Sequence, residues 1–566
     1  MTSSAIHCAE RRPLPRFYPI LFLLLPCLLA YDPSAPRPLP ALHSTIDAIL
    51  SSPCRPAADP NLLTHELQVA EEEHAKDVSR ARRRHPIDWS EPVENGGDAL
   101  PCAPAGSFGP HVLSYPTTNL PHANSDLVLR TSAPLLSSAE CDALLDAAER
   151  TGSARGWASR YTLQSTQTEV HLDDLPAETQ AWVLRDAVPR LCRTVSARMF
   201  TDADGHCSVP PESLAIYDAL VIKYDPSVGK SHLVAHADFG LVSCTIQLND
   251  GFEGGGTWYQ CLEGPAGAGS GGTVGAGTGQ RTGKGHATMH AGPLWHAGAH
   301  TTGRAPRYIL TLFLLSDRFP DANRRLQNRV INALRVANLY GEGSAAPNRQ
   351  KVGRAAEAAT ALLGCALHLH PLDAESYADL VPAYRKLGRL DLAAEAGRTA
   401  CSVDMLNGAA QNFGTWFQYG ESLVALAEEP GGDARRRTSI LTEAIATYRE
   451  VVRLHRVQPA AATGGGSFLS SALSGLGGAL RRRALTDEDT VEAGLVLEEA
   501  VGVDGENVSG WSELGLLMEQ NGGEAELEAA KVCKTQVVMI GMKKRQEAEI
   551  RAKREAVVGG KGFKKN

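Results

Sequence analysis

The sequence predicts an α+β multidomain protein, in which a β-sheet domain with flanking helices precedes an all-α region of helical repeats. Three observations lead to this fold class. The chain has 566 residues, which is more than a single hydrophobic core accommodates. Short apolar segments between residues 214 and 315 alternate with turn residues, a pattern typical of a sandwich or a squashed barrel. From about residue 319 onward, apolar residues recur at helical spacing.

The N-terminal segment has the layout of a secretory signal. Arg11, Arg12 and Arg16 precede the apolar run FYPILFLLLPCLLA at 17–30. This run is shorter than the roughly 20 residues that span a bilayer. We therefore predict a signal peptide or signal anchor at 1–30 and entry into the secretory pathway, in the lumen of the endoplasmic reticulum or the Golgi. Cleavage and anchoring stay open.

Residues 31–127 are rich in Pro, Ala, Ser and charge, with one short helical stretch at 65–84. This composition favours a linker that is largely disordered. Order is predicted to resume at 127–150, where a strand leads into a helix capped by Ser138. A second helix is expected at 176–200, interrupted by Pro189.

Short strands are predicted after these helices. The segment 263–285 has ten glycines in 23 residues, too little apolar surface to order itself, so it is expected to be a flexible loop inserted between two strands. The predicted strands are 214–224, 241–249, 256–261, 286–290 and 307–315.

The C-terminal half contains pairs of amphipathic helices. Their pattern of an aromatic residue, Leu-Gly and a later small residue resembles tetratricopeptide repeats of about 34 residues, with plain helical hairpins as the alternative. The predicted hairpins are 373–404, 415–459, 467–504 and 508–536. The predicted domains are thus 1–30 (signal), 31–127 (linker), 128–318 (sheet domain), 319–360 (helical linker), 361–540 (helical repeats) and 541–566 (basic tail).

Charge and cysteine content exclude some classes of function. A net charge of −8 spread over this length gives no case for nucleic-acid binding, and the basic end at 543–566 is interpreted as a solvated helix end. The twelve cysteines form no CxxC pair, so no structural zinc is predicted. The triplet at 507–509 is a glycosylation acceptor that fits a lumenal location but often arises by chance.

The triplet His236-Ala237-Asp238 follows strand-like residues. In an extended chain, residues i and i+2 face the same way, so the imidazole and the carboxylate point to one side. One more histidine from a neighbouring strand would complete a two-histidine, one-carboxylate face that leaves positions open on Fe(II). Taken alone, this triplet is weak evidence, and an ordinary surface pair is the better explanation.

The order of the surrounding segments adds to this evidence. Tyr224 ends the apolar strand ALVIKY, LNDGFEGGGTWY follows the triplet, and GKGHATMHAGPLWHAGAHTTGRAPRYILTLFLL comes after the glycine-rich loop. Over residues 128–318 the sequence resembles the iron- and 2-oxoglutarate-dependent dioxygenases of the prolyl 4-hydroxylase type. The resemblance implies a double-stranded β-helix, or jelly-roll, as the catalytic domain.

The resemblance implies His236, Asp238 and His296 as metal ligands. His290 falls where the family usually has an apolar or aromatic residue, and it becomes the ligand if the register is shifted. His286 and His300 are expected to have structural or supporting parts.

The resemblance also assigns the cosubstrate's partners. The distal carboxylate of 2-oxoglutarate needs a buried cation, and a guanidinium suits it. Arg307 is that residue by resemblance, while one extra residue in the spacing keeps Arg304 as an alternative. Tyr224 is expected to donate its hydroxyl to the same cosubstrate, unless it is an ordinary core tyrosine.

The activity that the resemblance implies is hydroxylation of an unactivated C–H bond by an Fe(II) enzyme that consumes 2-oxoglutarate and O₂ and releases succinate and CO₂. Ascorbate is expected as the reductant that restores the iron. A prolyl residue of a secretory-pathway protein is the first candidate acceptor, and a lysyl residue or a small molecule is the next. The helical repeats could hold a peptide substrate. From another class, an inactive barrel on a helical-repeat scaffold stays open.

Overall fold

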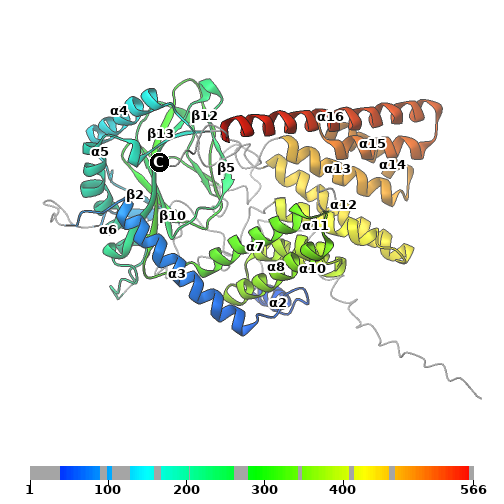
Figure 1. Ribbon diagram of the computed structural model, residues 1–566, viewed down its shortest axis with the longest axis horizontal. Helices are drawn as coiled ribbons and strands as arrows, with labels where there is room; N and C mark the ends of the chain where they lie inside the picture. The colour runs from blue at the N-terminus through cyan, green and yellow to red at the C-terminus, as the bar shows by residue number, and fades with distance from the viewer. Residues whose placement is uncertain are drawn as a thin grey trace, which may run out of the picture.

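The protein consists of a β-sheet domain and a C-terminal helical region, joined by a helix from the N-terminal part (Figure 1). The computed structural model describes residues 39–89, 99–104, 128–158, 167–202, 204–259, 278–341, 347–406, 413–457 and 466–559. The predicted signal at 1–30 lies outside these residues. No helix in the described ranges is both long and apolar enough to cross a membrane.

The sheet domain contains one large and one small antiparallel sheet. The large sheet has seven strands in the order β1-β2-β10-β6-β13-β4-β3, and the small one has the order β5-β11-β8-β9. The large sheet comprises β1 (Cys102–Pro104), β2 (Val128–Thr131), β10 (Ala287–Ala291), β6 (Val242–Gln247), β13 (Arg307–Ser316), β4 (Leu214–Tyr224) and β3 (Thr168–His171). The small sheet comprises β5 (Leu233–His236), β11 (His296–Gly298), β8 (Thr257–Tyr259) and β9 (Thr278–Gln280), and β12 (Thr301–Thr302) pairs with β7 (Glu253–Gly254).

The two faces of the large sheet have different neighbours because side chains alternate along a strand. On β13, Leu310, Leu312 and Leu314 join the main hydrophobic core under α4 (Ser138–Arg155) and α6 (Val188–Met199). The odd-numbered residues Ile309, Thr311 and Phe313 instead line a cavity of about 270 Å³. Residues of the small sheet line the same cavity, so it lies between the two sheets. The five predicted strands are confirmed, whereas the jelly-roll topology stays a prediction.

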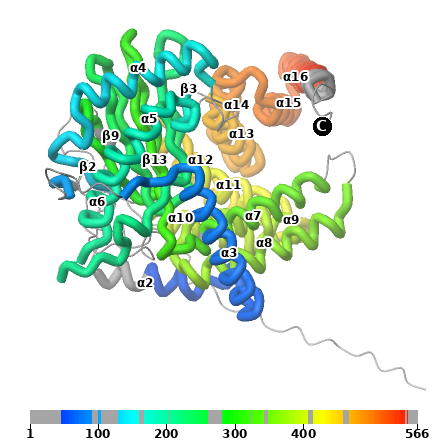
Figure 2. Tube along the Cα trace, turned by 60° about the vertical axis from the view of Figure 1, so that its left-hand side comes forward, coloured from blue at the N-terminus to red at the C-terminus, as the bar shows by residue number. Residues whose placement is uncertain are grey.

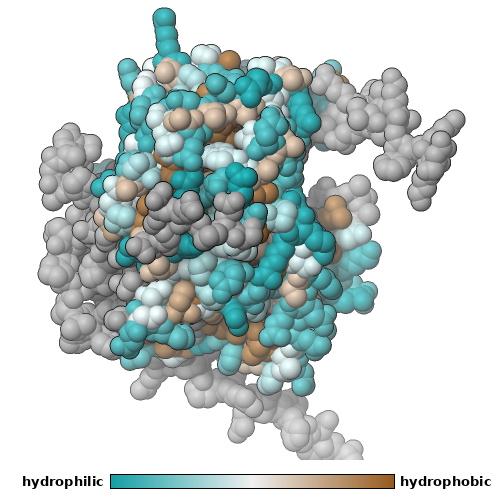
Figure 3. All heavy atoms as spheres, turned by 90° about the vertical axis from the view of Figure 1, so that its left-hand side faces the viewer, coloured by the Kyte–Doolittle hydropathy of each residue, from teal (hydrophilic) through white to brown (hydrophobic). Residues whose placement is uncertain are grey.

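A capping box begins one of the helices that cover the large sheet, and a π-helical turn before a proline interrupts another. Ser137, one residue before the predicted cap, caps α4 in a capping box with Glu140. Between α5 (Ala177–Trp182) and α6, a π-helical turn covers Val183–Ala187. It precedes Pro189, which has no N–H to continue the α-helical ladder. Hydrophilic side chains predominate on the outer side of this part of the molecule (Figure 3).

The C-terminal region is an array of antiparallel helices. Each helix packs on the next in sequence, and α9, α11, α13 and α15 also contact one another in turn. All four predicted hairpins are present. The helices are α7 (Ala322–Leu339), α8 (Arg349–Leu369), α9 (Ala374–Lys386), α10 (Leu390–Leu406), α11 (Phe413–Ala427), α12 (Ala434–Val457), α13 (Gly466–Arg483), α14 (Asp487–Val503), α15 (Val508–Asn521) and α16 (Glu524–Gly559).

Close helix packing in the array depends on glycines that face tyrosines. A Cβ atom on Gly397 of α10 would lie 2.8 Å from the Tyr419 ring of α11 and 2.9 Å from its Cα. We expect Gly397→Ala to lower the free energy of unfolding by about 1–3 kcal/mol, because the backbone of α11 cannot move aside freely. Gly353 of α8 has no atom within 4 Å of its Cβ position, so Gly353→Ala should stabilise by roughly 0.5–1 kcal/mol. Thermal unfolding followed by far-UV circular dichroism checks both, and equal shifts would contradict this account.

The linker prediction for 31–127 is wrong for its ordered part. Helix α2 (Leu39–Leu50) contacts α10, and α3 (Pro60–Arg84) lies across β4, α7 and α8 (Figure 2). Ala70, His74, Val78 and Ala81 form a buried stripe on α3. The helical stretch was predicted at 65–84, but its packing against the sheet and the helical array was not, because its apolar face is short and set among charged residues.

Ionic and hydrogen-bonded contacts connect α3 to both regions. The His74 Nε2 atom lies 2.6 Å from the carbonyl oxygen of Ser316 in β13. Arg325 of α7 donates to Asp77 of α3 at 2.8 Å. Helix α3 therefore joins the end of the sheet domain to the first helix of the array.

Two further predictions are corrected, and the interpretation of the basic end as a helix end agrees with the structure. The glycine-rich loop at 263–285 is not wholly a loop, because Thr278–Gln280 forms β9 against β8; residues 260–277 lie outside the described residues. The helical linker at 319–360 is mostly α7 and α8, which pack as a hairpin at the head of the array. The basic tail at 541–566 continues α16 as far as Gly559.

The predicted glycosylation acceptor is engaged in structure. The Asn507 amide donates to Ser470 at 2.6 Å and Ser474 at 2.9 Å, and its oxygen accepts from the Gly510 N–H at the start of α15. A glycan on this amide would disrupt these contacts, so the triplet is better explained as a helix cap. The nine cysteines in the described ranges are free thiols.

Candidate metal site and adjoining pocket

Two neighbouring strands of the small sheet bring two of the predicted histidines together. His236 ends β5 and His296 begins β11, and the antiparallel register pairs these two residues directly. Their ring centroids are 4.4 Å apart. This contact joins residues that are far apart in the sequence, so it depends on strand pairing.

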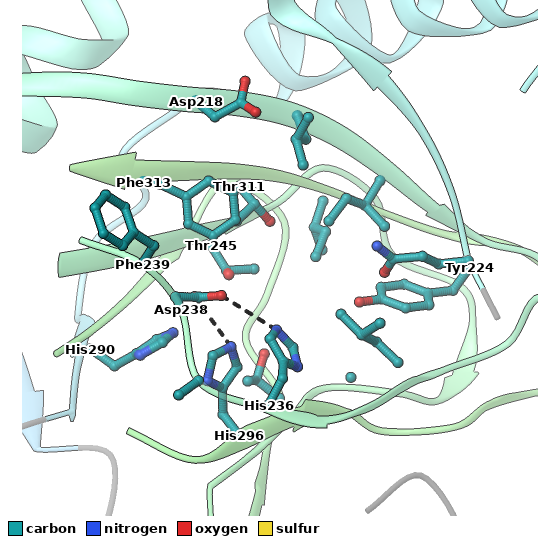
Figure 4. Close-up of a pocket in the computed structure, with 18 of the residues that line it drawn as sticks. Asp218, Tyr224, His236, Asp238, Phe239, Thr245, His290, His296, Thr311 and Phe313 are labelled. Carbon is teal, nitrogen blue, oxygen red and sulfur yellow. Dashed lines mark ion pairs between the residues drawn. The ribbon is translucent and has the colours of Figure 1, made fainter. Parts of the chain in front are cut away.

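Asp238 completes the cluster. Its Oδ1 atom lies 3.4 Å from His236 Nε2, and its Oδ2 atom lies 3.3 Å from His296 Nε2. One possible ligand atom from each of the three residues lies within 4.8 Å of the others (Figure 4). The Asp238 backbone N–H donates to the Gly292 carbonyl at 2.9 Å, which fixes the chain beside β10.

The hydrogen bonds of the two histidines leave the right atoms available to a metal ion. His236 Nδ1 lies 2.8 Å from the Val234 carbonyl, and His296 Nδ1 lies 2.8 Å from the Leu294 carbonyl. Because a carbonyl only accepts, each Nδ1 carries a proton, and Nε2 is the ring nitrogen that faces Asp238 and can bind a metal ion in place of a proton. Backbone partners of this kind orient metal-ligating histidines.

The electrostatics of Asp238 favour its anionic form. Burial by itself raises the pKa of this carboxyl, but attraction to His296 and hydrogen bonds from both imidazoles outweigh burial and hold the pKa well below its usual range. Two imidazole nitrogens and one carboxylate oxygen are the donor set of the open two-histidine, one-carboxylate site. The residues present therefore fit a divalent iron ion.

The other candidate histidines lie outside this cluster. His290 is buried on β10, with its ring centroid 4.3 Å from that of His296, but its ligand atoms are not part of the close set. His286 stands at the start of β10 with Nδ1 3.0 Å from the Thr131 carbonyl. His300 packs against His232 at 4.0 Å and contacts Ser231.

Arg307 is a buried cation next to the cavity. It is 3 % exposed, and its guanidinium donates to the Gln247 side chain and to the Gly256 carbonyl, each at 3.0 Å. Burial lowers its pKa, and in the described part of the chain it forms no ion pair with a carboxylate. A buried guanidinium held only by neutral acceptors suits an anionic ligand. The alternative, Arg304, is exposed in the preceding turn.

Tyr224 lies opposite Arg307 in the β4–β13 register, and the Arg307 guanidinium carbon lies 5.3 Å from the centroid of its ring. Burial raises the pKa of Tyr224 to about 12, so the phenol keeps its proton as a donor. A Cβ atom on Gly298 would lie 2.6 Å from the Tyr224 hydroxyl, so only glycine lets this hydroxyl approach β11. The hydroxyl therefore lies beside the strand that carries His296.

A second polar group borders the space next to Arg307. The buried Thr301 hydroxyl has no hydrogen-bond partner within the described ranges. A side chain at Gly255 would lie 3.0 Å from Arg307 Cδ and 3.3 Å from Thr301 Oγ1, so both residues border the same space. The sequence analysis missed Thr301, which begins β12, the strand that follows the one carrying His296.

The cavity extends beyond the cluster in two directions. Toward one end it is lined by Tyr224, Leu233 and Ile309; toward the other it is lined by Asp218, Phe239 and Phe313 (Figure 4). From Arg307 to Phe313 the strand advances about 20 Å, at roughly 3.4 Å per residue. This length separates the buried cation from the far end of the cavity.

The far end carries residues that the sequence analysis did not single out. Asp218 is buried, forms an ion pair with Arg84 of α3 at 3.2 Å and lies 3.5 Å from His171 Nδ1. Phe239 and Phe313 form apolar walls beside it. Alternation along 214–224 and 307–315 could have indicated the cavity-facing residues, but not which elements they face.

The class that the fold and the site define is a two-sheet domain with a candidate His-Asp-His metal site, followed by a helical array. No family model matches the chain, and no curated protein matches it.

Solved structures that are similar to parts of this chain include alpha ketoglutarate- or 2OG-dependent enzymes and TPR proteins. One is the non-heme alpha ketoglutarate dependent epimerase SnoN from nogalamycin biosynthesis, at 14% identity over 34% of this chain and 78% of that one, with a TM-score of 0.25. Another is an oxidoreductase of the 2OG-Fe(II) oxygenase family from Burkholderia pseudomallei, at 17% identity over 36% and 89%, with a TM-score of 0.25. A thermophilic TPR protein from Thermus thermophilus has 18% identity over 41% and 98%, with a TM-score of 0.28. These similarities are low, so the function is inferred from the geometry of the site.

Proposed function

We propose that the protein is an Fe(II)- and 2-oxoglutarate-dependent dioxygenase that hydroxylates an unactivated C–H bond. One observation carries this proposal. His236, Asp238 and His296 converge on one point of a cavity that also reaches toward the buried Arg307, a cation without a carboxylate partner among the described residues. A metal site and an anion site that border one cavity match the two ends of a bound keto acid.

The proposed roles follow from the contacts. His236, Asp238 and His296 would hold the iron, which when bound supplies the activation of O₂ that couples decarboxylation of 2-oxoglutarate to hydroxylation. Arg307 binds the distal carboxylate of the cosubstrate through its guanidinium, and Tyr224 donates its hydroxyl to the same molecule.

Apolar side chains of the cavity complete the site. Leu233 and Ile309 belong to the cluster around Tyr224 and exclude water from the space between the metal residues and Arg307. The far end of the cavity, at Phe239 and Phe313, then remains for the substrate. We propose that the two sheets form the double-stranded β-helix that the sequence resembles.

Uncoupled turnover tests this proposal. The full chain, incubated with Fe(II), ascorbate and 2-oxoglutarate, is expected to release succinate at a rate at least about tenfold above that of His296→Ala, which removes one proposed metal ligand. His286→Ala is the matched control, because His286 contacts Thr131 outside the cluster, and it should keep the rate. No succinate, even with a panel of Pro- and Lys-containing peptides present, would favour an inactive barrel on a helical scaffold.

The proposed acceptor is a prolyl residue in a secretory-pathway protein, with a lysyl residue or a small molecule as alternatives. The order of sequence motifs and the signal-like segment at 1–30 support it. The C-terminal helices are proposed to hold a peptide substrate, because stacked helical hairpins offer an extended surface. Mass spectrometry of a peptide panel after incubation with the full chain, searching for one added oxygen atom, distinguishes prolyl from lysyl products.

A further inference from the structure

His290 is a third imidazole beside the candidate metal site. Its register partner on β6 is Ser243, which in turn pairs with Phe313 of β13, so His290 belongs to the row at the far end of the cavity. It is 1 % exposed and lines the cavity. Its neighbour Met289 points the opposite way, into the core under the helices. Figure 4 shows His290 next to His296 and Asp238.

The form of the His290 ring follows from its backbone contact. The Nδ1 atom lies 3.0 Å from the Ala291 carbonyl, which can only accept, so Nδ1 carries the proton. The Nε2 atom of the neutral ring therefore bears the lone pair and can accept a hydrogen bond. In His236 and His296, too, Nδ1 donates to a backbone carbonyl.

His290 lies next to the metal-binding set without being part of it. The spacing of its ring centroid from that of His296, 4.3 Å, nearly equals the 4.4 Å between His236 and His296. Its ligand atoms nevertheless fall outside the set whose atoms lie within 4.8 Å of one another. A role as a direct ligand therefore does not follow from this arrangement.

Packing alone gives no reason for a nitrogen atom at this position. The ring packs edge-on to Tyr259 at 5.2 Å, and a phenyl ring would fill the same volume. Burying an imidazole acceptor without a partner costs about 1–3 kcal/mol, so a histidine here needs a donor within the cavity.

We propose that His290 is a positioning residue: its Nε2 accepts a hydrogen bond from a water molecule in the cavity beside Asp238 and His296, and through that water strengthens the binding of a divalent metal ion. The inference rests on the proposed metal site. Partners one shell beyond the ligands typically change metal affinity by about 10–100-fold.

Titration of the metal-free full chain with Co(II), followed by its visible absorption, tests the proposal. His290→Phe keeps the ring and removes the acceptor, so we expect its Kd for Co(II) to rise by about tenfold. His290→Gln keeps a polar acceptor and should stay within about threefold of the unsubstituted protein. Met289→Leu, on the same strand but facing the helices, is the control and should bind Co(II) unchanged.

The outcomes separate this inference from the proposed function. If His290→Phe bound Co(II) with the Kd of the unsubstituted protein, the inference alone would be overturned. The same holds if the Phe and Gln variants lost Co(II) affinity equally, because the changed shape of the side chain would then explain both losses. Absence of Co(II) binding by the unsubstituted protein would overturn the metal site and the inference together. If His290→Phe does not fold, as judged by circular dichroism, His290→Leu serves as the second acceptor-free variant.

Discussion

Replacing Asp238 with alanine is expected to abolish both metal binding and succinate formation. Asp238 is the only anionic member of the close set. Its Oδ1 atom contacts His236, and its Oδ2 atom contacts His296. Its loss removes a ligand and the charge that offsets a divalent cation, so metal affinity should fall by on the order of 10²-fold or more. Succinate release should then fall to the level of a reaction without enzyme.

Metal-induced stabilisation provides an independent measurement for Asp238→Ala. A metal ion at 100 times its Kd stabilises the folded protein by about 2.7 kcal/mol, which raises the Tm of the unsubstituted chain by several degrees. We expect no such shift in the variant. Asp218→Asn, which alters a buried carboxylate in the same cavity, is the matched control: its Tm should be lower, but the metal-induced shift should remain. A full shift in Asp238→Ala would overturn the ligand assignment.

Replacing Arg307 with alanine is expected to raise the KM for 2-oxoglutarate by roughly 10- to 150-fold. Hydrogen bonds to charged groups contribute about 1.5–3 kcal/mol, and each 1.4 kcal/mol changes an equilibrium constant tenfold. Arg307→Lys should recover part of the loss, because an ammonium keeps the charge but not the forked geometry. Steady-state kinetics with varied 2-oxoglutarate, at saturating Fe(II), provide the measurement.

Arg304→Ala is the matched control for the cosubstrate site. Arg304 is exposed three residues earlier, so its loss should change the KM for 2-oxoglutarate by less than about twofold. The alanine variant of Arg307 also deprives Gln247 and the Gly256 carbonyl of their donor, so its Tm must be measured alongside. An unchanged KM in a folded Arg307→Ala variant, or a larger effect at Arg304, would contradict the assignment.

Much of the fold was predictable from local patterns. The strands at 214–224 and 307–315 and the four hairpins follow from alternation and helical spacing, which are properties of neighbouring residues. The helical stretch at 65–84 was predicted, but its packing was not, because its buried stripe finds its partners in β4 and α7, far along the chain. The role of Asn507 as a cap likewise depends on Ser470 and Ser474 of another helix.

The residues of the candidate site were suggested by the sequence, but their arrangement was not. Spacing within one strand placed His236 and Asp238 on one side. Four histidines further along the chain were then candidates, and only the pairing of β5 with β11 puts His296 into the close set and leaves His290 outside it. The contact of Asp218 with Arg84, which comes from α3, carries no local signal at all.

By itself, the sequence determined which segments are strands and helices and which donor groups the chain offers, because alternation, capping and residue chemistry act between near neighbours. Only the tertiary structure decided that Arg307 is buried while Arg304 is exposed, and which strands meet at His236 and His296. Those outcomes depend on contacts between residues far apart in the chain, whose free energies come from shared burial and strand pairing that no local pattern records.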